Sequence, residues 1–242
     1  MTRNVLVTGG SRGLGLAICR RLLADGDRLF VVSRSLTPEA EALSEQYPGR
    51  WTHIAYDLGN DREIRQRVFR EGIGDDVPLH GLVNNAAVAY DDLVTNLNPE
   101  PLESMFRVNV FSPMVCTKYA IRNMLLHRVA GSLVHVSSIS VHTGYKGLAM
   151  YAATKGAIEA FSKNTAREWG SRSIRSNCIV AGFMPTSMSA SLSEEQLQRI
   201  YRRTALGRPT DPDSVAAMAA FLLGEESRSV TGQNLHVDSG TV

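Results

Sequence analysis

Three residues near the middle of the chain have the types and spacing of an acid–base group. Tyr151 and Lys155 lie four residues apart, one turn of a helix, and Ser138 precedes the tyrosine by thirteen residues. A phenol with its ordinary pKa of about 10 is a poor proton donor or acceptor at neutral pH. An ammonium group on the same helix face favours the phenolate and should lower that pKa. The spacing therefore predicts a tyrosine acid–base catalyst assisted by a lysine.

A second pattern stands near the N-terminus, where an apolar stretch leads into Gly9, Gly13 and Gly15. Glycines between a strand and a helix permit a tight turn and let backbone N–H groups approach the phosphates of a dinucleotide. Such a turn is weak support alone, but its position before an amphipathic helix favours cofactor binding. Together the two patterns predict hydride transfer between a nicotinamide and a carbonyl or alcohol.

The elements that must position these residues alternate between short apolar strands and amphipathic helices. Strands are expected at Asn4–Thr8, Arg28–Ser33, Trp51–Asp57, Gly81–Asn85, Gly131–Ser137, Ile174–Ile179 and Asn234–Val237. Helices are expected at Arg12–Ala24, Pro38–Tyr47, Arg62–Glu71, Leu102–Arg128, Ala149–Gly170, Glu194–Thr204 and Asp211–Leu223. This alternation predicts an α/β fold, a Rossmann-type doubly wound parallel sheet of about seven strands with helices on both faces. Without repeats or linkers, residues 1–242 are expected to form one domain.

Composition excludes several classes of protein. The net charge of +2 does not suggest a nucleic-acid-binding protein, and no apolar run approaches the roughly 20 residues that span a membrane. A strand expected from Asn4 leaves no room for a signal peptide. Three scattered cysteines, Cys19, Cys116 and Cys178, indicate reduced thiols in a cytoplasmic protein, and the histidines show no metal-ligand spacing.

The order and spacing of these motifs resemble the short-chain dehydrogenase/reductase family, and most of all its 3-oxoacyl-[acyl-carrier-protein] reductases. The resemblance extends from Asn4 to Gly240 and includes the run Tyr151-Ala152-Ala153-Thr154-Lys155. It implies that Tyr151 exchanges the proton, that Ser138 binds the substrate oxygen, and that Lys155 tunes the tyrosine and binds the ribose. It also implies that Asn109 holds a proton-relay water. Family spacing selects Ser138 over Ser137 and Ser140, although a tyrosine–lysine pair can also be a solvated helix edge.

The same resemblance implies a set of cofactor-binding residues. An NAD enzyme usually has a carboxylate after its second strand, but no acidic residue stands between Asp27 and Glu39. Arg34, with Arg12 from the glycine turn, suits the 2′-phosphate of NADP(H) instead, unless both are solvated surface residues. Ala87 and Ala181 depart from the family pattern. The expected cofactor-binding residues are Gly9, Ser11, Arg12, Gly13, Leu14, Gly15, Arg34, Asp57, Leu58, Asn85, Ala86, Tyr151, Lys155, Gly182, Met184 and Thr186.

The irregular segment from Gly182 to about Leu206 is expected to form a flap over the carboxyl ends of the strands, or else a plain connecting loop. Asp57 can likewise be read as an adenine contact or as a turn cap.

The expected activity is NADPH-dependent reduction of a 3-oxoacyl thioester. The alternatives are oxidation or reduction of a free small, steroid-like or sugar substrate and, more remotely, a non-catalytic nucleotide sensor. A homotetramer is expected, by resemblance and because two helices are apolar on more than one face. Arg128 and Arg172 match or adjoin positions that dock the acyl carrier protein in the resembled reductases, and would form a basic rim beside the pocket; the alternative is ordinary surface arginines.

Overall fold

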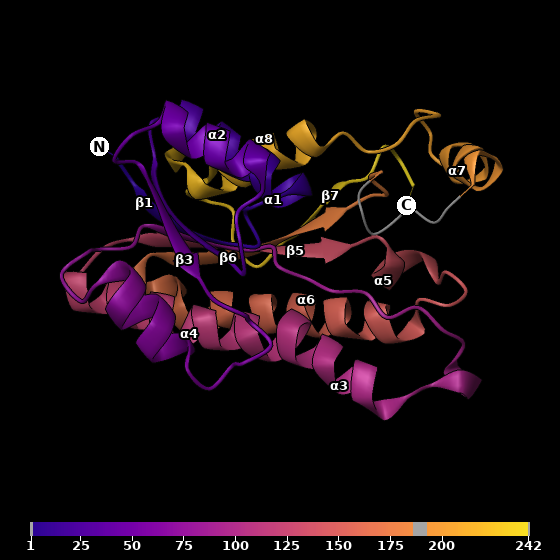
Figure 1. The fold of residues 1–242 in the computed structure, drawn as a ribbon, viewed down its shortest axis with the longest axis horizontal. Helices are drawn as coiled ribbons and strands as arrows, with labels where there is room; N and C mark the ends of the chain where they lie inside the picture. Colours follow the sequence, from indigo (N-terminus) through magenta and orange to yellow (C-terminus); the bar gives the residue numbers. More distant parts are fainter. Residues whose placement is uncertain (1, 186–192, 242) are drawn as a thin grey trace.

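One parallel sheet forms the centre of the molecule in the computed structural model, which describes residues 2–185 and 193–241. Its seven strands lie in the order β3-β2-β1-β4-β5-β6-β7 (Figure 1). The chain therefore winds outward in both directions from β1 and β4, which confirms the predicted doubly wound fold. The strands are β1 (Asn4–Thr8), β2 (Arg28–Ser33), β3 (Trp51–Ala55), β4 (Gly81–Asn84), β5 (Gly131–Ser138), β6 (Ile174–Ala181) and β7 (Asn234–Val237).

Helices cover both faces of this sheet. Figure 1 shows α1, α2 and α8 on one face and α3, α4 and α6 on the other. The α-helices are α1 (Gly13–Ala24), α2 (Pro38–Gln46), α3 (Pro99–Phe106), α4 (Ser112–His127), α5 (Ser140–Thr143), α6 (Ala149–Trp169), α7 (Glu194–Tyr201) and α8 (Pro212–Leu223). In the described ranges, the π-helical segments are η1 (Arg65–Ile73) and η3 (Arg107–Phe111), and the short 3₁₀ turns are η2 (Val94–Asn96), η4 (Gly170–Arg172) and η6 (Glu225–Ser227).

Strand residues alternate between two apolar cores. Val5 and Val7 belong to a cluster with α1 and α8, whereas Leu6 belongs to a second cluster with η1 and α4. Successive side chains of a strand point to opposite faces, so a strand covered on both sides must be apolar throughout. This explains the unbroken apolar runs in the sequence.

The largest departure from the predicted helices concerns the expected helix Leu102–Arg128. It begins earlier, at Pro99, because the side chain of Asn98 accepts a hydrogen bond from the Glu100 N–H and proline fits the first turn. It is also interrupted by the π-helical turn Arg107–Phe111. Such turns are frequent at functional sites, and this one contains Asn109.

The three cysteines are buried. Cys19, Cys116 and Cys178 each have no exposed surface and none forms a disulfide. Burial raises the pKa of Cys116 and that of Cys178 to about 12, because the thiolate would lose its hydration. Among the described residues, no helix has the length and apolar character to cross a membrane. The cytoplasmic location stays a prediction.

Candidate active site

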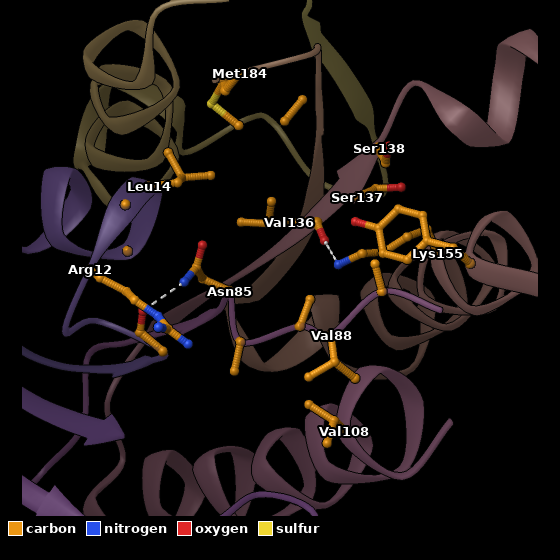
Figure 2. A pocket seen from close by; sticks show the side chains of 18 of the residues that line it. Arg12, Leu14, Asn85, Val88, Val108, Val136, Ser137, Ser138, Lys155 and Met184 are labelled. Carbon is orange, nitrogen blue, oxygen red and sulfur yellow. Dashed lines mark hydrogen bonds between the residues drawn. The ribbon is translucent and has the colours of Figure 1, made fainter. Parts of the chain in front are cut away.

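A cavity of about 820 Å³ opens at the carboxyl ends of the central strands. Figure 2 shows Arg12 at one end and Ser138 and Lys155 at the other, with Asn85 between them. It lies where the strand order reverses, the position at which doubly wound sheets bind ligands. The predicted residues that line it are Gly9, Ser11, Arg12, Gly13, Leu14, Gly15, Arg34, Asp57, Leu58, Asn85, Ala86, Ser138, Tyr151, Lys155, Gly182 and Met184. Thr186 lies outside the described residues.

The glycine turn is packed against the end of β4. A Cβ atom on Gly15 would stand 2.0 Å from the carbonyl oxygen of Gly9, and Gly9 itself has a φ of +69°. The Asn85 side-chain amide donates to the carbonyls of Thr8 and Gly9, both at 3.1 Å. Only glycine meets both requirements, so the shape of the turn is fixed by its neighbours.

The N-terminus of α1 faces the cavity with its N–H groups available. The N-cap residue, Arg12, places no side-chain acceptor on the first turn. Gly13 has a φ of +53° and open space where a Cβ would stand. Uncapped N–H groups and the helix dipole together favour an anion. These features fit the diphosphate of a dinucleotide.

Basic and hydroxyl side chains surround the cavity beyond the end of β2. Arg12 and Arg34 are both exposed and both line it, with Ser33, Ser35 and Thr37 beside them. The arrangement fits a phosphate on the adenosine ribose, because guanidinium groups bind phosphate through paired N–H donors. It also leaves no acid at the end of β2.

Two other cofactor predictions have a structural outcome. Asp57 lines the cavity and also accepts a hydrogen bond from the Gly59 N–H at 2.8 Å, so its turn-capping role is present in the structure. Ala87, which replaces a family glycine, is not among the described residues with positive φ. Its methyl group is therefore tolerated without backbone strain.

The end of β5 distinguishes the three candidate serines. The Ser137 hydroxyl is engaged, donating to the Glu159 carboxylate at 2.5 Å. Ser138 interacts with Tyr151 and lowers the pKa of its phenol, and the Ser138 hydroxyl oxygen accepts the Ser140 N–H at 3.2 Å. The hydroxyl oxygen of Ser140 is buried. The structure thus brings Ser138, and not Ser137, together with the tyrosine.

The electrostatics of Tyr151 and Lys155 differ from the prediction. Burial raises the pKa of Tyr151 to about 12, Asp91 adds to the rise, and the hydrogen bond with Ser138 opposes it. Burial lowers the pKa of Lys155 to about 8. The predicted lowering of the tyrosine pKa by the lysine is therefore wrong in this structure, because desolvation of the phenolate dominates. Lys155 Nζ instead donates to the Val136 carbonyl at 2.9 Å and lies 5.7 Å from the tyrosine ring centroid.

Asn109 does not line the cavity, although it is buried beside it. Its amide donates to the Val88 carbonyl at 2.8 Å and to Thr154 Oγ1 at 3.2 Å, and its oxygen accepts the Val88 N–H at 2.9 Å. The side chain thus joins the segment after β4 to α6, the helix of Tyr151. The relay water expected at Asn109 stays a prediction.

The segment after β6 closes one side of the cavity. Gly182 donates its N–H to the Val237 carbonyl at 2.9 Å, and a Cβ there would stand 2.1 Å from Thr210 Oγ1. Phe183 and Met184 line the cavity, as does Ile200 of α7. The described parts of the segment expected to form a flap therefore lie beside the cavity, and residues 186–192 lie outside the described part of the chain. Whether the segment acts as a flap stays a prediction.

Several cavity residues were not predicted from the sequence. They come from the segments after β4 and before α6, from α3 and η3, and from α7 and the residues just after it, none of which has a motif of its own. Asp91 is notable among them because its burial raises its pKa and its charge acts on Tyr151. The residues are Ala89, Asp91, Ser104, Val108, Tyr145, Lys146, Leu148, Ile200 and Arg203.

The expected basic rim beside the pocket is wrong for a single subunit. Arg128 follows α4 and Arg172 lies in η4, just before the first residues of β5 and β6. Both therefore stand at the amino edge of the sheet, while the cavity lies at its carboxyl edge. The eight residues of β5 separate the two edges by roughly 27 Å.

Comparison with known proteins finds similarity along nearly the whole chain. A family model described as Enoyl-(Acyl carrier protein) reductase matches residues 9–242. Carbonyl reductase family member 4 of Xenopus tropicalis is 34% identical over 240 residues, covering 99% of this chain and 98% of that protein. The 3-oxoacyl-[acyl-carrier-protein] reductase FabG of Chlamydia pneumoniae is 31% identical over 241 residues, covering 98% and 96%. A gluconate 5-dehydrogenase of Burkholderia cenocepacia, solved with NADP and tartrate, has a TM-score of 0.91 at 25% identity, covering 99% and 94%.

The doubly wound sheet, with its cavity where the strand order reverses, is a Rossmann-type fold, and the family match makes the protein an oxidoreductase. The chain belongs to the short-chain dehydrogenase/reductase family.

Proposed function

We propose that this protein reduces a ketone to a secondary alcohol with NADPH, and that the ketone is a 3-oxoacyl thioester. The observation that carries the proposal is that Tyr151, Ser138 and Lys155 line one end of a cavity whose other end suits a dinucleotide. When bound, NADPH would supply the hydride.

The tyrosine is suited to the reductive direction. With its pKa at about 12, the phenol of Tyr151 carries its proton at neutral pH and can donate it to the carbonyl oxygen that gains charge. Ser138, beside it, orients and stabilises the same oxygen. Lys155, anchored on the Val136 carbonyl, keeps the tyrosine helix in place against β5.

The preference for NADPH is supported by Arg12, Arg34 and the absence of an acid at the end of β2. Glycines 9, 13 and 15 and the uncapped start of α1 would hold the diphosphate. A neighbouring fold at 25% identity was solved with NADP. A carboxylate after β2 would repel the 2′-phosphate, and none is present there.

The thioester proposal is supported by similarity to the 3-oxoacyl-[acyl-carrier-protein] reductases and by two cavity cations. Lys146 and Arg203 are exposed and line the cavity, where they would favour the phosphate of a carrier or coenzyme A arm. The similarity to carbonyl reductases makes a free ketone the second candidate. The family model's description adds a third, reduction of an enoyl thioester.

A substrate panel tests the proposal. Acetoacetyl thioesters of coenzyme A and of acyl carrier protein, a crotonyl thioester, and free ketones, quinones and sugar acids would each be assayed with NADPH and NADH. We expect the highest kcat/KM for a 3-oxoacyl thioester with NADPH. A free carbonyl or the enoyl thioester exceeding it would overturn the substrate assignment, and NADH exceeding NADPH would overturn the cofactor assignment.

A further inference from the structure

A buried carboxylate stands directly behind the proposed catalytic group. Glu159 of α6 is 7% exposed and receives three donors: Ser137 Oγ at 2.5 Å, Asn234 Nδ2 at 2.7 Å and His142 Nε2 at 3.2 Å. Its only ion-pair partner among the described residues is the histidine. Burying a carboxylate is costly unless hydrogen bonds replace its hydration, and here neutral and histidine donors do so.

The three donors come from three different elements. Ser137 is in β5, His142 is in α5 and Asn234 begins β7, while Glu159 itself is in α6. One side chain therefore joins the strand of the catalytic serine, the short helix that follows it, and the helix of the catalytic tyrosine.

The residues of α6 that contact the end of β5 lie on one face of the helix. Tyr151, Lys155 and Glu159 follow one another at four-residue intervals and so share one face of the helix. Lys155 holds the carbonyl of Val136 and Glu159 holds the hydroxyl of Ser137. Two successive residues of β5 are thus bound by two successive turns of the helix, and Ser138 is the next residue.

On the side of His142, the contacts of this cluster continue to Gly182, in the segment that closes the cavity. The His142 and His236 rings lie 4.9 Å apart, and His236 Nδ1 is 3.7 Å from the Asp238 carboxylate. A Cβ on Gly182 would stand 2.6 Å from the Asp238 Cα. The cluster therefore packs between the catalytic serine and the segment that closes the cavity.

We infer that Glu159 is a positioning residue: it fixes the end of β5 so that the Ser138 hydroxyl is held against Tyr151. The inference rests on the proposed hydride transfer. None of the Glu159 partners except Ser137 lines the cavity, and the glycine turn and Arg34 lie at its other end. Loss of Glu159 should consequently slow the chemical step and spare nucleotide binding.

The main test compares E159L with E159Q. E159L removes all three acceptor contacts with little change in volume, and kcat should fall about 10- to 100-fold, because small misplacements of catalytic groups have effects of this size. The NADPH KM should stay within about twofold. E159Q keeps a hydrogen-bonding side chain and should recover most of the kcat. Asp27→Leu is a matched control, because Asp27 is also buried, at 2% exposed, but pairs with Arg3 at the amino edge of the sheet.

The control should lose stability without a selective loss of kcat. Wild-type kcat in E159L, or an equal loss in E159Q and E159L, would overturn the inference. Should E159L fail to fold, S137A removes a single donor and should reduce kcat in the same direction, with wild-type kcat contradicting the role.

A second readout needs no turnover. The phenol of Tyr151 can be titrated by its absorbance near 295 nm, after subtraction of the Y151F variant, and S138A supplies the reference for a lost hydrogen bond. That bond lowers the tyrosine pKa, so E159L should raise it in the same direction as S138A. An equal Tyr151 pKa in E159L and the wild type would overturn the positioning role, even if the enzyme were active. If E159L raises the pKa of Tyr151 but the wild-type enzyme does not reduce ketones, the positioning role is supported and the proposed function is refuted.

Discussion

Lys155 Nζ donates a hydrogen bond to the carbonyl oxygen of Val136 at 2.9 Å, two residues before Ser138 (Figure 2). The lysine therefore connects the helix of the tyrosine to the strand of the serine. It is 4% exposed, and the carbonyl dipole compensates part of the cost of burying an ammonium group. In this structure Lys155 therefore acts mainly by holding the helix against the strand, and less by attracting a phenolate.

Replacing Tyr151 with Phe should nearly abolish turnover, because only the proton donor is removed. A general acid typically contributes about 10²- to 10⁴-fold. NADPH affinity, followed by fluorescence, and thermal stability should both stay close to those of the wild type. Retention of more than about a tenth of wild-type kcat would contradict the assignment.

Replacing Arg34 with Asp should change the cofactor preference. The new carboxylate repels a 2′-phosphate and can accept a hydrogen bond from a 2′-hydroxyl. The ratio of kcat/KM for NADPH to that for NADH should therefore fall. Arg20→Asp is the matched control, since Arg20 is exposed on α1 and does not line the cavity. An equal ratio in R34D and R20D would show that Arg34 does not bind the phosphate.

His135 should make the fold sensitive to acid. It is fully buried, accepts from the Asn84 amide at 3.1 Å, and lies 3.3 Å from Ser176 Oγ, so burial lowers its pKa to about 4. A folded-state pKa below the unfolded value means that stability is complete above about pH 6.5 and is lost as the pH falls towards 4. At about 1.4 kcal/mol per pKa unit, the loss is on the order of 3 kcal/mol.

Urea unfolding at pH 7 and pH 4.5 measures this effect. His135→Gln can keep both hydrogen bonds without titrating, so it should lose less stability between the two pH values than the wild type. His127→Gln, at a half-buried position where the new amide can keep the hydrogen bond to the Asp75 carbonyl, should behave as the wild type does. An equal pH dependence in all three proteins would rule out His135 as the cause.

The protein is expected to assemble as a homotetramer. Phe111 is 45% exposed and Leu126 is 69% exposed, at the two ends of the α4 region, and Phe221 of α8 is 36% exposed. Apolar side chains on helix faces turned away from the sheet are typical of subunit contacts. Light scattering should give about four times the 26.4 kDa of one chain, and a stable 26.4 kDa particle would contradict this.

Carrier docking through Arg128 and Arg172 is the last prediction. If a carrier-bound substrate is delivered there, changing both to Glu should lower kcat/KM for that substrate and spare a short free thioester, because surface charge mainly speeds encounter. Added salt should weaken the wild-type preference. Since both arginines stand at the amino edge, delivery to the cavity of the same subunit must bridge the length of β5. Equal losses on both substrates would indicate a structural role, and no loss would refute docking.

Strands were the part of the fold that the sequence predicted best. Three of them have the predicted limits: Asn4–Thr8, Arg28–Ser33 and Asn234–Val237. The first two are buried along most of their length, and a strand buried on both faces must be apolar throughout. Helix limits were less predictable. They depend on single caps such as Asn98, and the π-helical turn at Asn109 has no distinct residue preference in the sequence.

The site likewise contains residues that the sequence could predict and others that it could not. The glycine turn and the Tyr151–Lys155 spacing are local patterns, so the sequence revealed them. Asp91 and Arg203 reach the cavity from segments without periodicity, and only the fold brings them there. Glu159 is on an amphipathic helix, where a lone acid reads as a surface residue, and its burial depends on donors as far as 75 residues away.

The sealed thiols have a practical consequence. Cys19 is in α1, Cys116 is in α4 and Cys178 is in β6, so the three thiols lie in three separate elements of the fold. A thiol reagent in solution can react with each only when that region opens, and its rate then reports the free energy of opening. The chain therefore contains three intrinsic probes of local unfolding, which can be resolved by mass spectrometry without any engineered label.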